Sequence, residues 1–203
     1  MTVCVTRRFL SSAVVRCGVT AAVVGLLCSL AATRALEAQA PQRVSAQFSA
    51  FSTLMTANGT RAIGVGVEPQ IRVNGPHSGN RGLSLGVGAQ LTQHYFSDGT
   101  LTLTGAIVEP RLTYSNTLLS AWYLAARAGL LKQRSDAASS TSGYAVGIGA
   151  GSIRAIGGPY LDIGLGVVYQ DFADARTPTG RVYQFSGTLA FVAKVGISIG
   201  IGG

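Results

Sequence analysis

The chain has 203 residues, of which 12% are charged and 47% hydrophobic, and it contains 27 Gly. Soluble domains carry about 25% charged residues, so this composition excludes an ordinary soluble domain, a disordered chain and, through its Gly content, a helical bundle. The net charge of +8 is not gathered in a basic run or an aromatic-interleaved patch, so no nucleic-acid partner is expected.

The N-terminal segment has the features of a secretory signal peptide. Arg7, Arg8 and Arg16 make a basic region at its start. Residues 19–32 then form a nearly unbroken apolar run, which is shorter than the roughly 20 residues of a spanning helix. Residues 38–40, Ala-Gln-Ala, offer the small-x-small pattern of a cleavage site. We therefore expect residues 1–40 to be a cleaved signal peptide and residues 41–203 to be the mature domain.

Other interpretations of this segment stay open, among them a retained membrane anchor. Arg7-Arg8 is compatible with a twin-arginine export signal, and Cys28 with a lipidation site. Every Cys of the chain, Cys4, Cys17 and Cys28, precedes the predicted cleavage site. The mature domain therefore has neither a disulfide framework nor a thiolate metal site.

After the predicted cleavage site, apolar and polar side chains alternate with a period of two. In residues 63–73 the odd positions are Ile, Val or Pro, whereas the even positions are Gly, Glu, Gln or Arg. Such alternation is typical of a strand with one apolar and one polar face, and helical periodicity is absent. The predicted strands are 44–55, 62–73, 82–95, 101–114, 122–132, 143–154, 160–170 and 182–201.

Turn-forming residues separate these strands. Asn58-Gly59 and Asp98-Gly99 are strong hairpin signals. The other breaks are expected at 74–76, at 115–116, from 135–136 onward, at 157–159 and at 174–180. Sequential hairpins form an antiparallel meander, and closing the meander removes both sheet edges. The predicted fold is all-β, an eight-stranded antiparallel up-and-down barrel.

A faint internal repeat places a Pro in the middle of two predicted strands. Residues 66–71, Gly-Val-Glu-Pro-Gln-Ile, recur as residues 107–112, Ile-Val-Glu-Pro-Arg-Leu. Because Pro inside a strand commonly marks a bulge or an edge, we expect bulges at Pro69 and Pro110. The apolar parity slips near residue 107, as a bulge would produce.

The character of the two strand faces favours a transmembrane barrel over a soluble, lipocalin-like one. The polar face consists mostly of Gly, Ala, Ser, Thr and Gln, which suit a cramped interior better than bulk water. The other face, of Leu, Ile, Val and Phe, suits hydrocarbon. Two aromatic girdles are expected, with Tyr95, Phe96, Tyr144, Tyr169, Phe172, Tyr183 and Phe185 at the outer ends and Tyr114, Trp122, Tyr123 and Tyr160 at the inner ends. The longest outer loops are expected around 132–142 and 171–181.

This combination resembles the small eight-stranded outer membrane proteins, the OmpA/OmpX-like barrel group. The resemblance covers the whole mature domain, and it is one of pattern: a signal peptide, eight alternating strands, short inner turns and longer outer loops. It implies a place in the outer membrane of a Gram-negative bacterium. Members of the group commonly end in an aromatic residue, whereas this chain ends Ile201-Gly202-Gly203.

Ionisable residues on the inward face form the candidate site. They are Glu68, Arg72, Glu109, Arg111, Arg127 and Lys194, with Asp162 and His94 on the polar faces of their strands. Because an unpaired buried charge is costly, charges of both signs in a narrow barrel indicate a paired structural network that fills the lumen. The alternative is a narrow pore for small solutes or ions, lined by the same residues.

Catalysis would need a His beside a nucleophile or a carboxylate. His77 lies in a predicted inner turn, and His94 near Ser97 and Asp98 at an outer strand end, where an outer-membrane lipid-modifying enzyme would need it. Such groupings are common in loops, so no catalytic residue is assigned. The sequence has no phosphate loop, metal-ligand spacing or nucleotide fingerprint, so neither a cofactor nor a metal is expected.

The expected function is a structural or interaction role in the outer membrane, with a plugged polar lumen. The expected partners are outer membrane lipids and the barrel assembly machinery, and the expected state is a monomer. The predicted outer loops lack the aromatic anchors of a strong binding surface, so no ligand is named.

Overall fold

The computed structural model describes residues 43–57, 60–78, 80–96, 99–117, 120–135, 138–173, 175–176, 182–183 and 187–201. The chain divides into two units, Met1–Ala38 and Gln39–Gly203, and all described residues lie in the second. The predicted signal peptide and its cleavage site therefore lie outside the described residues. No helix among the described residues is long and apolar enough to cross a membrane.

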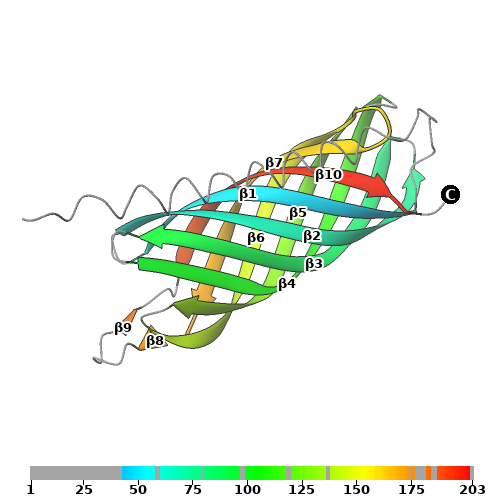
Figure 1. Ribbon diagram of the computed structural model, residues 1–203. Coiled ribbons are helices and arrows are strands. Elements are labelled where there is room, and N and C mark those ends of the chain that lie inside the picture. The colour runs from blue at the N-terminus through cyan, green and yellow to red at the C-terminus, as the bar shows by residue number, and fades with distance from the viewer. Residues whose placement is uncertain are drawn as a thin grey trace, which may run out of the picture. The chain divides into compact units, whose positions relative to one another are not determined.

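In the described part of the chain, eight strands close into an antiparallel barrel (Figure 1). They are β1 (Val44–Ala57), β2 (Thr60–Ser78), β3 (Arg81–Phe96), β4 (Gly99–Thr117), β5 (Ser120–Ser135), β6 (Ala138–Ala155), β7 (Tyr160–Phe172) and β10 (Thr188–Gly200). Each strand pairs with its neighbour along the chain, and β1 pairs with β10 from Ser45↔Gly200 to Met55↔Ala190. The predicted eight-stranded up-and-down barrel is confirmed.

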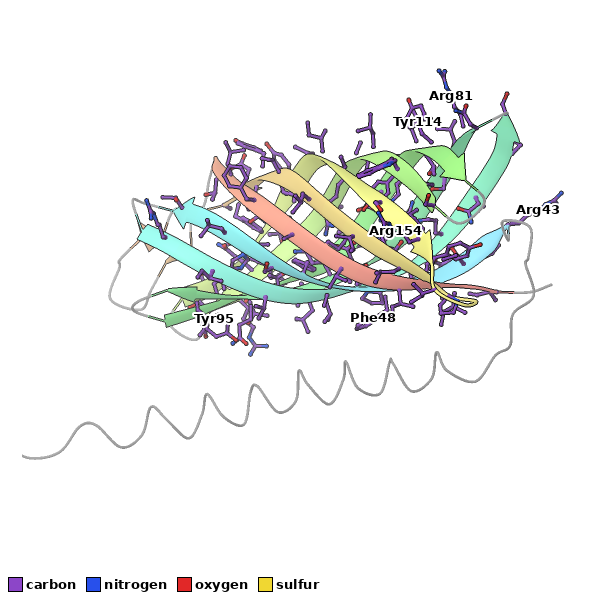
Figure 2. All side chains as sticks on the ribbon, turned by 90° about the horizontal axis from the view of Figure 1, so that it is seen from above. Arg43, Phe48, Arg81, Tyr95, Tyr114 and Arg154 are labelled. Carbon is purple, nitrogen blue, oxygen red and sulfur yellow. The ribbon has the colours of Figure 1, made fainter. Side chains whose placement is uncertain are left out.

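The barrel has two ends, which differ in their connections. At the terminal end β1 begins and β10 ends, and Figure 2 shows Arg43 and Arg81 there. At the hairpin end lie the β1–β2, β3–β4 and β5–β6 connections and the longer segment between β7 and β10. Within that segment β8 (Ala175–Arg176) pairs with β9 (Val182–Tyr183) in a separate two-stranded sheet (Figure 1).

The large apolar side chains cover the outside of the barrel, as the alternation predicts. Leu130 is 74% exposed, Ile148 73% and Leu165 69%, and the neighbouring residues on each strand turn inward. A lipocalin-like barrel would have the reverse arrangement, with its apolar face lining a cavity. This outer surface is unsuited to water and suited to hydrocarbon.

The predicted bulges at Pro69 and Pro110 are wrong. Pro69 lies opposite Phe48 and Pro110 opposite Leu85, with no change of register. A Pro removes one ladder donor, but a sheet can lose that hydrogen bond without taking in an extra residue. The register shifts lie instead between Asn74 and His77 in β2, between Ser115 and Thr117 in β4 and between Gln133 and Ser135 in β5.

Two predicted turns and one predicted loop belong to strands. Residues 74–76 lie in β2 and residues 115–116 in β4. The β2–β3 and β4–β5 hairpins, which lie at the terminal end, therefore have longer strands than predicted. Within the predicted loop 132–142, β5 and β6 continue to pair, with Lys132 opposite Ser142. Small polar side chains indicate contact with water, and such contact is available to a paired ladder as well as to a loop. The last strand begins at Thr188, later than predicted.

Apolar side chains also gather inside the barrel, toward the hairpin end. This apolar layer consists of Met55, Ala62, Leu101, Leu103, Ile107, Leu131, Ala145, Val168, Phe172 and Ala190, with Val192 packed against it. The predicted slip of parity near residue 107 does not occur, because the odd side chains of β4 face inward from Leu101 to Arg111. Phe172 on β7, which was predicted for the outer girdle, belongs to this apolar layer instead.

Candidate functional site

The structure places all six predicted lumen residues inside the barrel and adds Asp162 to them. The charge network, as it is called below, consists of Glu68, Arg72, Glu109, Arg111, Arg127, Asp162 and Lys194. These residues come from β2, β4, β5, β7 and β10 and meet because the inward face of every strand points at one narrow axis. The network lies between the apolar layer and the terminal end.

Glu109 is the centre of the charge network. Its Oε1 lies 2.8 Å from Arg72 Nη2 and 2.8 Å from Arg111 Nε, and its Oε2 lies 2.9 Å from Lys194 Nζ. Arg127 Nη1 is 3.9 Å from the same Oε2. One carboxylate on β4 thus connects cations from β2, β5 and β10 as well as from its own strand.

Glu68 on β2 forms a second junction. Its Oε2 lies 2.5 Å from Arg127 Nη1, and its Oε1 is 3.5 Å from Lys194 Nζ and accepts a hydrogen bond from Gln70. Arg127 also donates from Nη2 to Gln90 Oε1 at 2.8 Å, which brings β3 into the network. Lys194 and Arg127 therefore each bridge the two glutamates.

Asp162 on β7 joins the network at the terminal side. Arg111 Nη1 lies 2.7 Å from Asp162 Oδ2, which also accepts a hydrogen bond from Gln47 Nε2 at 2.6 Å. Tyr123 donates its hydroxyl proton to Asp162 Oδ1 at 2.7 Å, and Arg111 stacks over the Tyr123 ring at 4.0 Å. Both oxygens of this buried carboxylate therefore have hydrogen-bond or ion-pair partners.

Tyr123 was predicted to belong to the inner aromatic girdle, and this is wrong. The residue is 3% exposed and faces the lumen, whereas its neighbour Trp122 is 57% exposed on the outside. Two lumen-facing glycines give the ring its space, because a Cβ at Gly151 or Gly164 would collide with Tyr123. In the sequence, only the repeated Gly residues of β6 and β7 indicated that a large side chain lies opposite these strands.

The charges of the network nearly compensate one another. Arg72, Arg111, Arg127 and Lys194 face three carboxylates, all in contact within the lumen. A buried charge costs several kcal/mol unless it is paired and hydrogen-bonded, and here Gln47, Gln70 and Gln90 supply further hydrogen bonds to the arginines. The arrangement is chemically suited to bracing strands from within.

The space beside the network is small. A cavity of about 40 Å³ lies next to Glu109, Arg127 and Lys194, against the glycines of β6 and β7. Since a water molecule needs roughly 10–15 Å³ by this measure, the cavity has room for a few waters and not for an organic ligand. Among the described residues, no cluster of His, Cys, Asp and Glu has the composition of a metal site.

His94 lies inside the barrel, on the inward face of β3 near the hairpin end. It is fully buried, and its Nε2 is 3.0 Å from Thr53 Oγ1, while its Nδ1 has no hydrogen-bond partner among the described residues. The predicted neighbours Ser97 and Asp98 lie outside the described residues, as does the side chain of His77. The described part of the chain thus places no carboxylate on the imidazole to orient it as a base.

Aromatic side chains mark both rims of the outer surface. Tyr95 and Tyr144 are exposed near the hairpin end, and the rings of Tyr144 and Tyr169 lie 6.4 Å apart (Figure 2 shows Tyr95). Near the terminal end Trp122 is exposed, and Arg81 lies 5.7 Å over the Tyr114 ring. The side chains of Phe96, Tyr183 and Phe185, also predicted for the outer girdle, lie outside the described residues.

Comparison with solved structures finds similar barrels. Neisserial surface protein A matches with a TM-score of 0.63 and 15% identity, over 80% of this chain and 100% of its own. The outer membrane enzyme PagL matches with a TM-score of 0.47 and 12% identity, over 75% of this chain and 99% of its own. No family model and no curated protein matches the sequence. In its fold, the chain resembles the small eight-stranded outer membrane barrels.

Proposed function

We propose that the mature domain, residues 41–203, resides in the outer membrane of a Gram-negative bacterium as a closed barrel with a structural or interaction role. The observation that carries the proposal is the filling of its interior. The nearly compensated charge network fills one part of the lumen, and the apolar layer, including the fully buried Leu103, fills another. We infer that the lumen is plugged.

Three further features support this placement. The outer surface is apolar between two rims of aromatic side chains, which is the pattern of a membrane barrel. The barrel fold is similar to that of Neisserial surface protein A. Residues 1–40 carry the predicted export signal. The proposed route is cleavage of the signal, insertion by the barrel assembly machinery and residence as a monomer among outer membrane lipids.

A narrow pore is the alternative, and conductance separates it from the plugged barrel. In planar bilayers the inserted protein is expected to give no discrete current steps, because ions would have to cross both the charge network and the apolar layer. A porin inserted in parallel controls for the sensitivity of the recording. Reproducible steps whose ion selectivity changes in Glu109→Gln would establish a pore and contradict the plug.

A lipid-modifying enzyme is the third possibility, and His94 is where it can be tested. We expect His94→Ala to leave the lipid A profile of the host unchanged, because the imidazole is buried against Thr53 and away from the outer surface. Mass spectrometry of lipid A from cells producing either form measures this. Loss of a modification in the variant, with normal barrel levels, would show that His94 takes part in catalysis.

A further inference from the structure

The outward face of β5 changes abruptly from apolar to cationic near the hairpin end. Trp122, Leu124 and Leu130 are exposed on this face, and Lys132 and Arg134 follow in the same parity, also exposed. From Trp122 to Lys132 a tilted strand rises roughly 25 Å along the barrel axis, which is the height of a membrane barrel's apolar band. The two cations therefore lie where hydrocarbon gives way to lipid headgroups.

Hydroxyl side chains surround the two cations on both neighbouring strands. Lys132 is directly opposite Thr104 on β4 and Ser142 on β6, and Arg134 is opposite Thr102 on β4. Directly paired side chains lie about 5 Å apart, and successive residues on one face are roughly 7 Å apart. Lys132, Arg134, Thr102, Thr104 and Ser142, here called the hairpin-end patch, thus combine two cations with three hydroxyl donors.

The described carboxylates are engaged elsewhere and do not neutralise this patch. Glu68, Glu109 and Asp162 are in the lumen, on the other side of the barrel wall. Asp171, on the outer face of β7, is hydrogen-bonded to Tyr144. Within the described residues, neither Lys132 nor Arg134 forms an ion pair. Among the described residues, the patch therefore carries two positive charges with no carboxylate paired to them.

We propose that the hairpin-end patch binds the phosphate of a lipid headgroup in the surrounding leaflet. Arg134 offers the planar fork of donors that matches a phosphate, Lys132 adds a second positive charge, and the hydroxyls donate to the remaining oxygens. The apolar surface below, beginning at Leu130, lies against the acyl chains of the same lipid. This inference rests on the proposed membrane placement and assigns it a lipid class: phosphorylated lipids of the leaflet that surrounds the hairpin end.

The test is a titration of fluorescent lipid A into the folded protein in neutral detergent micelles, read by anisotropy. Lys132→Gln with Arg134→Gln is expected to weaken binding by about tenfold or more, since a basic residue near a phosphate surface contributes about fivefold. Thr104→Val with Ser142→Ala keeps both charges and is expected to weaken binding by a smaller factor. Inorganic phosphate at millimolar concentration is expected not to displace the lipid.

The matched control is Arg81→Gln with Arg154→Gln, which removes the same charge from two exposed positions at the terminal end. If both double variants lose affinity equally, or neither does, general electrostatics explains any binding and the patch is not a site. Displacement by inorganic phosphate would show a free-anion site and overturn the lipid assignment. The heat-dependent gel mobility of each protein is measured first: a wild-type chain that never enters membranes overturns the proposed function, whereas a well-inserted chain without lipid preference overturns this inference alone.

Discussion

Replacing Glu109 with Gln is expected to lower the free energy of unfolding by about 3–5 kcal/mol, the usual cost of removing one partner from a buried ion network. The amide fills nearly the same volume, so the effect isolates the charge. Without it, Arg72, Arg111 and Lys194 each lose an ion-pair partner, and the four cations of the network face two carboxylates. Unfolding from lipid vesicles in urea can be followed by the fluorescence of Trp122, the single Trp of the chain.

The control for this prediction is Asp171→Asn, which removes a carboxylate outside the network. Asp171 lies on the outer face, and an exposed polar contact contributes about 0–1 kcal/mol, so its variant should unfold almost as the wild type does. Equal midpoints for the wild type and both variants would mean that the lumen charges do not brace the barrel.

Replacing Gly151 with Val is expected to destabilise the barrel about as strongly as Glu109→Gln does. A Cβ at this position would lie 2.5 Å from the carbonyl oxygen of Ile163 on β7 and would also collide with the Tyr123 ring. The carbonyl belongs to the β6–β7 ladder and can move only if the pairing Gly151↔Gly164 is disturbed. Overpacking costs about 1–3 kcal/mol or more, and displacing Tyr123 would also break its hydrogen bond to Asp162.

The neighbouring residue supplies a matched control for added bulk. Ala150 is exposed on the outer face of the same strand, so Ala150→Val adds two methyl groups to the lipid-facing side and is expected to fold normally. The folded fraction of each protein is measured as the band that shifts its mobility on boiling. A Gly151→Val protein that folds and resists urea as well as Ala150→Val would refute the tight packing of Tyr123 against β6.

Period-two alternation predicted the eight strands and the direction of most of their side chains, because the side-chain period of a strand is a local property. It also placed Glu68, Arg72, Glu109, Arg111, Arg127 and Lys194 on the inward face. Their partners could not be predicted, since these depend on register between distant strands: Lys194 and Glu109 are 85 residues apart. Tyr123 was assigned to the girdle as an aromatic residue near a strand end, although it alternates with the outward Trp122 and Leu124; only its partner on β7 depended on distant register.

Apolar residues inside the barrel could not be distinguished by hydropathy from those that face lipid. Leu101 and Leu103 suit a dry interior and a hydrocarbon surface equally well, and only the parity of Glu109 and Arg111 on the same strand identifies their direction. The misplaced turns have a related cause. Asn-Gly-Pro at residues 74–76 favours a turn locally, but pairing with β3 on either side extends the strand beyond it.

The measurement that tests the central claim most directly is the gel mobility of the full chain, unheated and boiled, from separated envelope and periplasmic fractions. A closed membrane barrel resists detergent until heated, so we predict a mobility shift on boiling, confined to the outer membrane fraction. A protein found soluble in the periplasm, with the same mobility before and after boiling, would contradict the account.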